Sequence, residues 1–334
     1  MLRVLVRATN WVGDAVMSLP AIREIRRVFP AAEITVAARP SVAGLYARET
    51  CIDRVIQYPA GGRRDLIARL REERFDCAIL LQNAFDAALV TWCAGIPERI
   101  GYRRDGRGLL LTRAIAVPEP GETPRHERYY YLELLRRAGL IERYPDCREI
   151  RLDGIAAARA SGASHMAALG VSGPAIGINP GAAYGNAKRW LPERFAEAAR
   201  SFAPAQVLVF GSAGERDLCA AVAAAVPGAR NFAGETSLAE FIDLAAACSL
   251  FLTNDSGAMH LASALDVPTV TVFGATDDTT TGPSSSRSRI VREHAECSPC
   301  LLRECPIDHR CMTRVTATRV AQIAHELWTP AARS

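Results

Sequence analysis

The sequence predicts an α/β protein made of two doubly wound parallel-sheet domains. Short apolar runs alternate with amphipathic stretches through the first half, and the same alternation returns in the second half. A length of 334 residues fits two domains of ordinary size, and 49% hydrophobic residues supply material for two cores. The segment Glu142–Gly173 separates the halves with a loop-rich start and an alanine-rich middle. We therefore expect domains at 1–155 and 156–334.

The apolar runs locate the strands, and the amphipathic stretches between them locate the helices. In the first half, strands are expected at Val4–Val6, Ile34–Ala37, Val55–Ile56 and Cys77–Leu81, with a helix at Ala15–Phe29. In the second half, strands are expected at Ala175–Ile178, Gln206–Phe210, Leu250–Thr253 and Thr269–Phe273, and helices at Pro192–Ser201, Gly214–Ala225, Ser237–Ala247 and Ser256–Ala264. A final helix at Thr316–Trp328 could pack back onto the N-terminal domain.

Composition narrows the class of protein. No run of eighteen apolar residues and no signal-peptide pattern occurs, so a soluble protein that keeps its N-terminus is expected. Ten cysteines without an export signal indicate a reducing compartment. Residues 1–150 carry 24 arginines against 19 acidic residues, whereas the remainder carries a net charge of −1. The positive half should meet an anionic partner.

Parallel α/β domains bind ligands beyond the carboxyl ends of their strands, so two such sheets would form a cleft with a ligand on each side. The first loop after a strand reads Asn10-Trp-Val-Gly-Asp14. Asp14 is either a cap of the following helix or a general base, with Gly13 allowing another molecule to approach the backbone.

The second loop, Asn179–Trp190, holds Lys188, which is the only lysine in the chain beside 39 arginines. Small residues, Gly181 among them, and the adjacent Lys188 and Arg189 before a helix suit a diphosphate, although the single lysine could be an accident of composition. The spacing of a nucleotide-hydrolysing P-loop is absent from the sequence.

The third loop reads Asn254-Asp-Ser-Gly-Ala-Met-His260. Ser256 and Gly257 would present backbone N–H groups to anionic oxygens at a helix start, and Asp255 would be free to accept hydrogen bonds from sugar hydroxyls. The alternative is structural, with Asp255 as a helix cap and His260 as a satisfied core histidine. We expect this loop to lie beside Lys188.

Taken in order, these motifs resemble glycosyltransferase family 9, the bacterial ADP-heptose:lipopolysaccharide heptosyltransferases. The likeness spans residues 2 to about 328. It rests on Trp11-Val-Gly-Asp14, Pro180-Gly-Ala-Ala-Tyr-Gly-Asn-Ala-Lys-Arg-Trp190, Phe210-Gly-Ser212, Ala233-Gly-Glu-Thr236 and the third loop. Within the family, the motifs are closer to the transferases that add the second heptose than to those that add the first.

The resemblance implies a GT-B fold, with the acceptor on the N-terminal domain and the nucleotide sugar on the C-terminal domain. It implies inverting transfer of L-glycero-D-manno-heptose from ADP-heptose to the first heptose of the lipopolysaccharide inner core. By position in the motifs, Asp14 matches the catalytic base and Lys188 the phosphate-contacting lysine. The other implied donor contacts are Gly181, Phe210, Gly211, Thr236, Asp255, Ser256, Gly257 and His260, and the implied acceptor contacts are Asn10, Trp11, Gly13, Arg103 and Arg104.

No Asp-x-Asp triplet, the usual carboxylate pair of metal-dependent sugar transfer, occurs in the sequence. We therefore expect no metal and no cofactor, with Lys188 and the helix start at Ser256 stabilising the leaving diphosphate. Asp14 would remove the proton of the acceptor hydroxyl.

Arginines crowd one stretch of the first half: Arg99, Arg103, Arg104, Arg107 and Arg113, followed by Arg125 and Arg128. Such a run is usually a solvated face, but here it could dock the acceptor and the anionic inner face of the inner membrane. The expected location is cytoplasmic, with peripheral membrane contact.

The cysteines Cys297, Cys300, Cys305 and Cys311 lie within fifteen residues, near His294 and His309. They could bind zinc, but their later spacing is irregular, and a loop of reduced thiols is the preferred interpretation.

The alternatives to the expected function are a family 9 transferase with a different acceptor and a nucleotide-sugar epimerase. A zinc-bearing nucleic-acid binder is disfavoured by 7% aromatic residues and by the lack of basic excess in the cysteine-bearing half.

Overall fold

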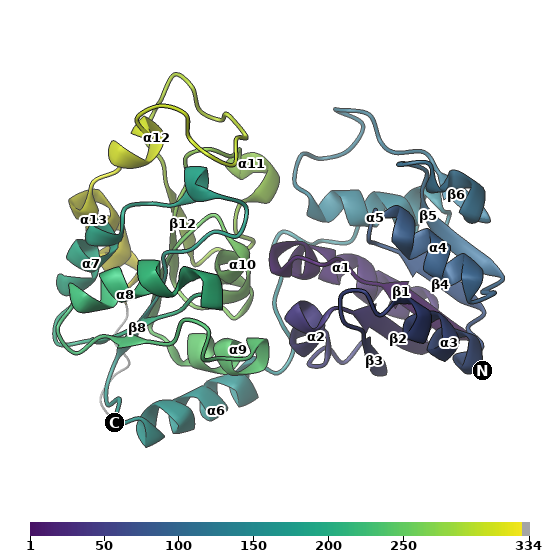
Figure 1. Ribbon diagram of the computed structural model, residues 1–334, viewed down its shortest axis with the longest axis horizontal. Coiled ribbons are helices and arrows are strands. Elements are labelled where there is room, and N and C mark those ends of the chain that lie inside the picture. Colours follow the sequence, from purple (N-terminus) through teal and green to yellow (C-terminus); the bar gives the residue numbers. More distant parts are fainter. Residues whose placement is uncertain (329–334) are drawn as a thin grey trace. The chain divides into compact units, whose positions relative to one another are not determined.

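The computed structural model describes residues 1–328, which divide into two compact units, one of Met1–Asp153 and one that begins at Gly154. Each unit holds one six-stranded sheet, and every strand pair in both sheets is parallel (Figure 1). The predicted α/β fold with two doubly wound sheets is confirmed. The division falls two residues before the predicted boundary.

The first sheet has the order β3-β2-β1-β4-β5-β6. Its strands are β1 (Arg3–Arg7), β2 (Glu33–Ala38), β3 (Arg54–Gln57), β4 (Cys77–Leu80), β5 (Glu98–Tyr102) and β6 (Arg113–Ile115). Its helices are α1 (Val12–Val28), α2 (Pro40–Tyr46), α3 (Arg63–Glu73), α4 (Phe85–Cys93) and α5 (Arg128–Arg137), with a 3₁₀ turn η1 (Arg107–Leu110).

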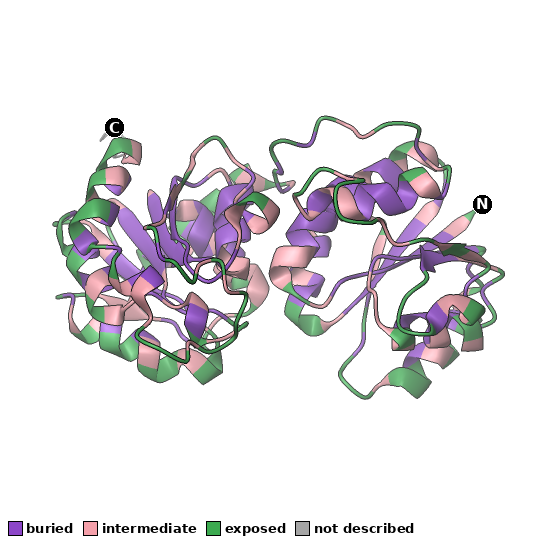
Figure 2. Cartoon of the chain, turned by 90° about the horizontal axis from the view of Figure 1, so that it is seen from above, coloured by how far each residue is buried: buried purple, intermediate pink, exposed green. Residues whose placement is uncertain are grey.

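Helices cover both faces of this sheet because alternate strand residues point to opposite faces. Leu5, Ala37 and Ala78 form one core cluster with Leu66 and Leu70 of α3 and with residues of α4. On the other face α1 packs against α2 and α5. The central strands are buried on both sides (Figure 2), which explains why they read as unbroken apolar runs in the sequence.

The second sheet has the order β12-β11-β10-β7-β8-β9, which repeats the topology of the first when its strands are counted from β7. Its strands are β7 (Ala175–Asn179), β8 (Gln206–Val209), β9 (Arg230–Asn231), β10 (Leu250–Asn254), β11 (Thr269–Val272) and β12 (Ser288–Val291). The helices are α6 (Ile155–Ala168), α7 (Pro192–Arg200), α8 (Arg216–Ala224), α9 (Leu238–Ala247), α10 (Gly257–Ala264), α11 (Asp278–Thr281), α12 (Arg310–Thr313) and α13 (Ala317–Leu327), with 3₁₀ turns η2 (Asn186–Lys188) and η3 (Ala213–Glu215).

Two helices add to what the sequence suggested. The alanine-rich part of the expected connecting segment is α6, a regular helix that packs along α9 so closely that a Cβ at Gly162 would lie 1.9 Å from the Asp243 carbonyl oxygen. The final helix, α13, packs on its own unit against α7 and β11 and buries Val320 and Ala324 in that core.

Candidate active site

The first predicted loop joins β1 to α1, and Asp14 lies in the first turn of α1. The helix begins at Val12 with Trp11 as its N-cap residue, so the predicted start at Ala15 is wrong by three residues and Asp14 is not the cap. A carboxylate in the first turn is stabilised by the positive end of the helix dipole. Trp11, next to it, leaves 61% of its surface exposed, and Asn10 and Gly13 are half-buried.

Asp14 is not an isolated acid, because α5 packs against α1 and brings Glu127 and Tyr131 into its electrostatic environment. Burial, reinforced by the negative charge of Asp14, raises the pKa of Glu127, while Arg104 opposes the shift. The same two causes raise the pKa of Tyr131. Sequence inspection missed Glu127, since it lies 113 positions from Asp14 and only the helix pairing connects them.

The second and third loops meet at the carboxyl ends of β7 and β10. Lys188 Nζ lies 2.6 Å from Asp255 Oδ2, and both side chains are largely buried. Asn254 joins the same loops at both ends: its Nδ2 donates to the Pro180 carbonyl at 2.7 Å, and its Oδ1 accepts from the Trp190 N–H at 3.0 Å. The prediction that the third loop lies beside Lys188 is confirmed.

Asp255 has a different role from the one expected. Its Oδ2 already accepts hydrogen bonds from Lys188 Nζ and, at 2.6 Å, from Thr276 Oγ1. The expectation that Asp255 is free for sugar hydroxyls is therefore wrong for this oxygen, which instead orients the ammonium group. An ammonium has three donors, so Lys188 can hold Asp255 and still donate to phosphate oxygens. Thr276 was missed, although it follows β11 as the other loops follow their strands.

Helix α10 begins at this point. Ser256 is its N-cap residue and accepts from the Met259 N–H at 3.4 Å, and Gly257 is the first helical residue. Asp255 is therefore not the cap. His260 is buried on the same helix, as the structural alternative predicted. The helix start therefore follows Asp255 directly in the chain, and backbone N–H groups at such a start attract anions.

The expected nucleoside contacts lie around the end of β8. Phe210 is 1% exposed, and its ring packs against Phe232, Phe241 and Phe251, so its side chain fills the core. Gly211 is half-buried, and a Cβ there would lie 2.5 Å from Cys219 Sγ. Thr236 is half-buried in the loop before α9. The nucleoside contacts of these residues stay predictions.

Gly181 has a stricter requirement, because a Cβ there would lie 2.1 Å from Glu215 Oε1. Glu215 accepts from the N–H and hydroxyl of Ser212 and lies 3.7 Å from Arg189. This carboxylate therefore stands against the backbone of the lysine-bearing loop. No signal in the sequence distinguished it from an ordinary helix-cap acid.

The cysteine-rich segment supports the lysine-bearing loop. The Arg303 carbonyl accepts from the Ala187 N–H at 3.0 Å, Cys305 N–H donates to Asn186 Oδ1 at 3.2 Å, and Tyr184 OH donates to the Leu301 carbonyl at 2.9 Å. All ten cysteines are free thiols. Within residues 1–328, no group of three or more His, Cys, Asp and Glu side chains is arranged to hold a metal ion.

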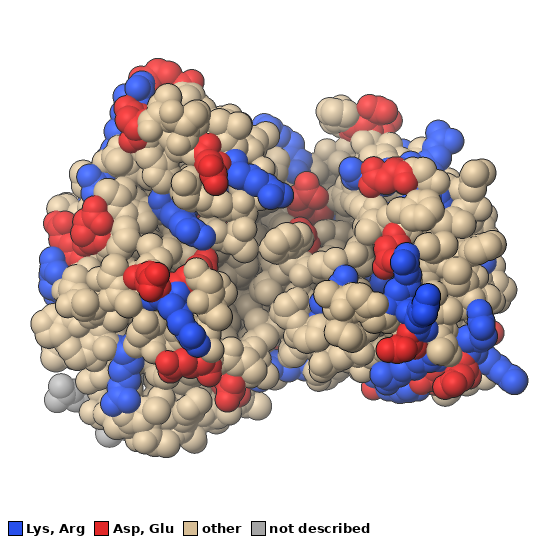
Figure 3. Space-filling view, in the orientation of Figure 1, with Lys and Arg blue, Asp and Glu red and all other residues tan. Residues whose placement is uncertain are grey.

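The arginine-rich stretch is mostly structural. Arg107 and Arg128 are buried and donate to backbone carbonyls, and Arg99 and Arg113 donate to carbonyls of their own unit. The stretch as a whole is therefore not a solvated face, because several of its arginines are buried or bonded within their own unit. Figure 3 shows basic and acidic side chains interspersed on the visible face of each unit. Arg103 and Arg104 remain exposed, with Arg104 3.4 Å from Asp105.

Comparison with known proteins decides the family. The model of glycosyltransferase family 9 (heptosyltransferase) matches residues 63–310.

The chain belongs to glycosyltransferase family 9.

Lipopolysaccharide heptosyltransferase 2 of Escherichia coli (strain K12) is 34% identical over 308 residues, covering 87% of this chain and 88% of that relative. Lipooligosaccharide heptosyltransferase 2 of Haemophilus influenzae (strain Rd) is 28% identical over 325 residues, with the same coverage. The solved structure of E. coli ADP-heptose lps heptosyltransferase II superposes with a TM-score of 0.83 at 31% identity, covering 98% of each chain. Family 9 membership makes this protein a glycosyltransferase and decides against the epimerase and nucleic-acid-binding alternatives.

Proposed function

We propose that this glycosyltransferase moves L-glycero-D-manno-heptose from ADP-heptose to the first heptose of the lipopolysaccharide inner core, with inversion at the anomeric carbon. The relatives named above are heptosyltransferases 2, and one is described as acting with ADP-heptose. The observation that carries the proposal is the pair formed by Lys188 Nζ and Asp255 Oδ2, 2.6 Å apart, beside the start of α10.

The donor diphosphate would lie against this pair. Lys188 offers its remaining donors as a compact positive charge, and α10 offers backbone N–H groups, so charge that develops on the departing ADP is stabilised without rearrangement. Asp255 accepts from the ammonium, and Thr276 in turn donates to Asp255. The ring of Tyr184, 5.0 Å from Nζ, covers the same cation.

Asp14 is the proposed general base. The acceptor hydroxyl attacks the anomeric carbon opposite the bond to ADP, Asp14 takes the hydroxyl proton, and the bond to the diphosphate breaks through an oxocarbenium-like transition state. Trp11, exposed beside Asp14, offers an apolar face on which a sugar ring can stack. Asn10, Gly13, Arg103 and Arg104 complete the proposed acceptor side.

The direct test combines purified protein with ADP-heptose and a core acceptor that ends in one heptose. ADP release that depends on the acceptor, together with an acceptor mass increased by one heptose, is the expected result. Acceptors lacking that heptose serve as controls, because transfer to them would identify a family 9 enzyme with a different acceptor. Heptose released as free sugar would contradict the proposed transfer.

We also propose that the reaction needs no metal or cofactor, since Lys188 and α10 supply the positive charge that a divalent cation would otherwise provide. Dialysis against a chelator should leave the rate of transfer unchanged, with added Mg²⁺ or Zn²⁺ as the matched control. A rate lost on chelation and restored by one metal would overturn this part of the proposal.

A cytoplasmic location with peripheral contact to an anionic membrane surface is proposed from the exposed Arg103 and Arg104. No helix within residues 1–328 has the length and apolar character needed to span a bilayer. Because salt screens exposed charges, raising the ionic strength should raise the acceptor KM more than the donor KM. Binding to vesicles should require anionic lipid; equal binding to neutral vesicles would argue against the electrostatic contact.

A further inference from the structure

The carboxyl end of the first sheet holds Arg7, whose burial lowers its pKa although Tyr58 and Asp86 oppose the shift. Arg7, the last residue of β1, is 0% exposed, and none of its three guanidinium nitrogens has a hydrogen-bond partner among residues 1–328. Its Cζ lies 4.6 Å from the ring centroid of Tyr58, and the Cζ of Arg39 lies 5.0 Å from the same centroid. Two like charges therefore share one aromatic ring.

Arg107 shows what a structural buried arginine looks like in this unit. It is also 0% exposed, but its guanidinium donates to the carbonyls of Tyr102 and Gln82 at 2.8 and 2.5 Å and to Asn83 Oδ1 at 3.0 Å. Contact with one aromatic face is worth only about 0.5–2 kcal/mol. Burying an unpaired ion costs several kcal/mol, so the contact with Tyr58 does not offset the burial of Arg7.

A pocket of about 390 Å³ adjoins this pair of arginines and is lined by Arg39, Tyr58, Arg63, Gln82 and Asp86, among others. Tyr58 is 5% exposed, and its hydroxyl has no partner within the described part of the chain. The one acidic residue of the lining, Asp86, lies 3.4 Å from Arg63. Around the pocket, three guanidinium groups therefore stand against one carboxylate.

Backbone groups add to the positive potential. The lining includes Gly62 and Ala84, which are the N-cap residues of α3 and α4, and neither helix start is capped by a side chain. Helix N-termini attract anions through their unpaired N–H groups and their dipole. Two amide oxygens, Asn10 Oδ1 and Gln82 Oε1, are buried without a partner among the described residues, and they can accept from hydroxyls.

We propose that this pocket binds an anionic sugar, with its phosphate or carboxylate group held by Arg39 and the start of α3 over the charge of Arg7, and its hydroxyls held by Asn10 and Gln82. A guanidinium fork matches either anion. Asn10 lies four residues before Asp14, in the loop that leads into α1, so the bound group would belong to the acceptor. That assignment to the acceptor rests on the proposed function; the binding itself does not.

Calorimetry on the full chain at constant ionic strength tests the binding. The probes are glucose 6-phosphate, glucuronate and glucose. A single saturable site for either anionic probe, with binding of glucose at least about 10-fold weaker, is the expected result. Preference between the two anions identifies the group that the pocket takes. Equal binding of all three probes, or binding of none, would overturn the proposal.

The variant Arg39→Gln should lower the affinity for the preferred probe by about 10-fold or more. Arg54→Gln is the matched control, since it removes the same charge from the amino end of β3, whereas Tyr58 follows the carboxyl end of that strand. Equal losses of probe affinity in both variants would show that only the net charge matters and would contradict the proposed binding site. If Arg39→Gln also raises the acceptor KM without changing the donor KM, the pocket serves the acceptor. If the probe binds but no heptose is transferred, the binding pocket is supported and the proposed function is contradicted.

Discussion

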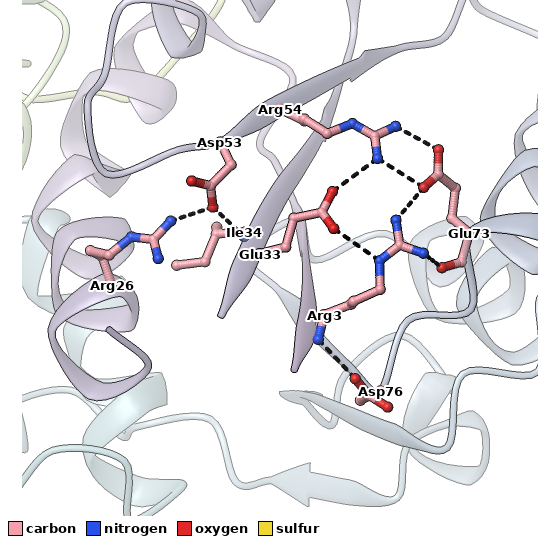
Figure 4. A network of polar contacts seen from close by, with 8 residues as sticks. All are labelled: Arg3, Arg26, Glu33, Ile34, Asp53, Arg54, Glu73 and Asp76. Carbon is pink, nitrogen blue, oxygen red and sulfur yellow. Dashed lines mark hydrogen bonds and ion pairs between the residues drawn. The ribbon is translucent and has the colours of Figure 1, made fainter. Parts of the chain in front are cut away.

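The two ends of the first sheet hold their arginines differently. At the amino end, Arg3 and Arg54 share Glu33 and Glu73: Arg54 lies 2.9 Å from Glu33 and 2.6 Å from Glu73, and Arg3 lies 3.1 Å from Glu33 (Figure 4). Each cation there is matched by a carboxylate of the same sheet or of α3. Such a network links β1, β2, β3 and α3, and each arginine in it already has a carboxylate partner.

At the carboxyl end, four residues further along β1, Arg7 has no such partner within residues 1–328. One strand therefore carries an arginine that is neutralised by carboxylates at one end and an arginine without a hydrogen-bond partner at the other. The carboxyl ends of the second sheet show an intermediate case, in which Lys188 is paired with Asp255 but keeps donors to spare. Four experiments test this contrast.

The largest effect is expected at Asp14. Asp14→Asn removes the proposed base, so kcat should fall by about 100-fold or more while ADP-heptose binding persists. Asp76→Asn is the control at the amino end, where the carboxylate accepts the Arg3 N–H at 2.8 Å; its kcat should stay within about twofold. Steady-state kinetics and donor titration measure both. Near-normal turnover of Asp14→Asn would show that Asp14 is not the general base.

Thr276→Val should act on the second sheet more mildly. Losing the hydroxyl that donates to Asp255 frees the Lys188 and Asp255 pair to move, and the donor KM should rise by about 5-fold with little change in kcat. Thr279→Val is the control, because Thr279 also donates to an aspartate, Asp277, but on an exposed turn. Equal kinetics in the two variants would show that the buried hydroxyl does not position Lys188.

Stability should respond in opposite ways at the two ends of β1. Arg3→Met leaves Glu33 and Glu73 with one cation fewer and should lower the free energy of unfolding by about 1–2 kcal/mol. Arg7→Met replaces a buried unpaired charge by an apolar side chain, so the free energy should stay unchanged or rise. Urea unfolding measures both. A large loss of stability in Arg7→Met would show that Arg7 is structural.

The smallest effect concerns pH. Hydrogen bonds from Arg54, with those from Arg3, lower the pKa of Glu73 from 4.5 to about 2. A pKa that is lower in the folded state than in the unfolded state stabilises the fold at pH values above the unfolded-state pKa. This contribution to stability is lost as the pH falls toward 2. The free energy of unfolding should therefore fall between pH 5 and pH 3, and this fall should be smaller by about 1 kcal/mol in Glu73→Gln than in the unchanged protein. An identical fall in both proteins would contradict the shifted pKa.

Much of the second unit was predictable residue by residue. The strand at 175–178, the helix at 256–264 and the meeting of the loops after them follow from apolar runs, turn residues and the rule that parallel strands end at one edge. The residues that contact one another inside that site were harder to predict from the sequence. Thr276 obeys the same rule and was overlooked, whereas Glu215 reaches Gly181 through a close approach that no local pattern encodes.

In the first unit, the arginine-rich stretch shows where inspection of composition fails. Arg103 and Arg107 are four residues apart and look alike in the sequence, yet one is exposed and the other is buried beneath three carbonyl groups and an amide. Burial depends on the turn η1 folding back over the strand ends, which charge counting cannot detect.

The sequence by itself determined the α/β class and the alternation of strands and helices in both halves, because backbone propensity and apolar periodicity act over a few residues. Its motifs also carry the resemblance to family 9. Only the tertiary structure decided which charges are neutralised. Lys188 meets Asp255 across 67 positions, Arg3 meets Glu73 across 70, and Arg7 forms no hydrogen bond with a carboxylate among the described residues. The energy of a buried charge depends on neighbours that only packing brings within reach.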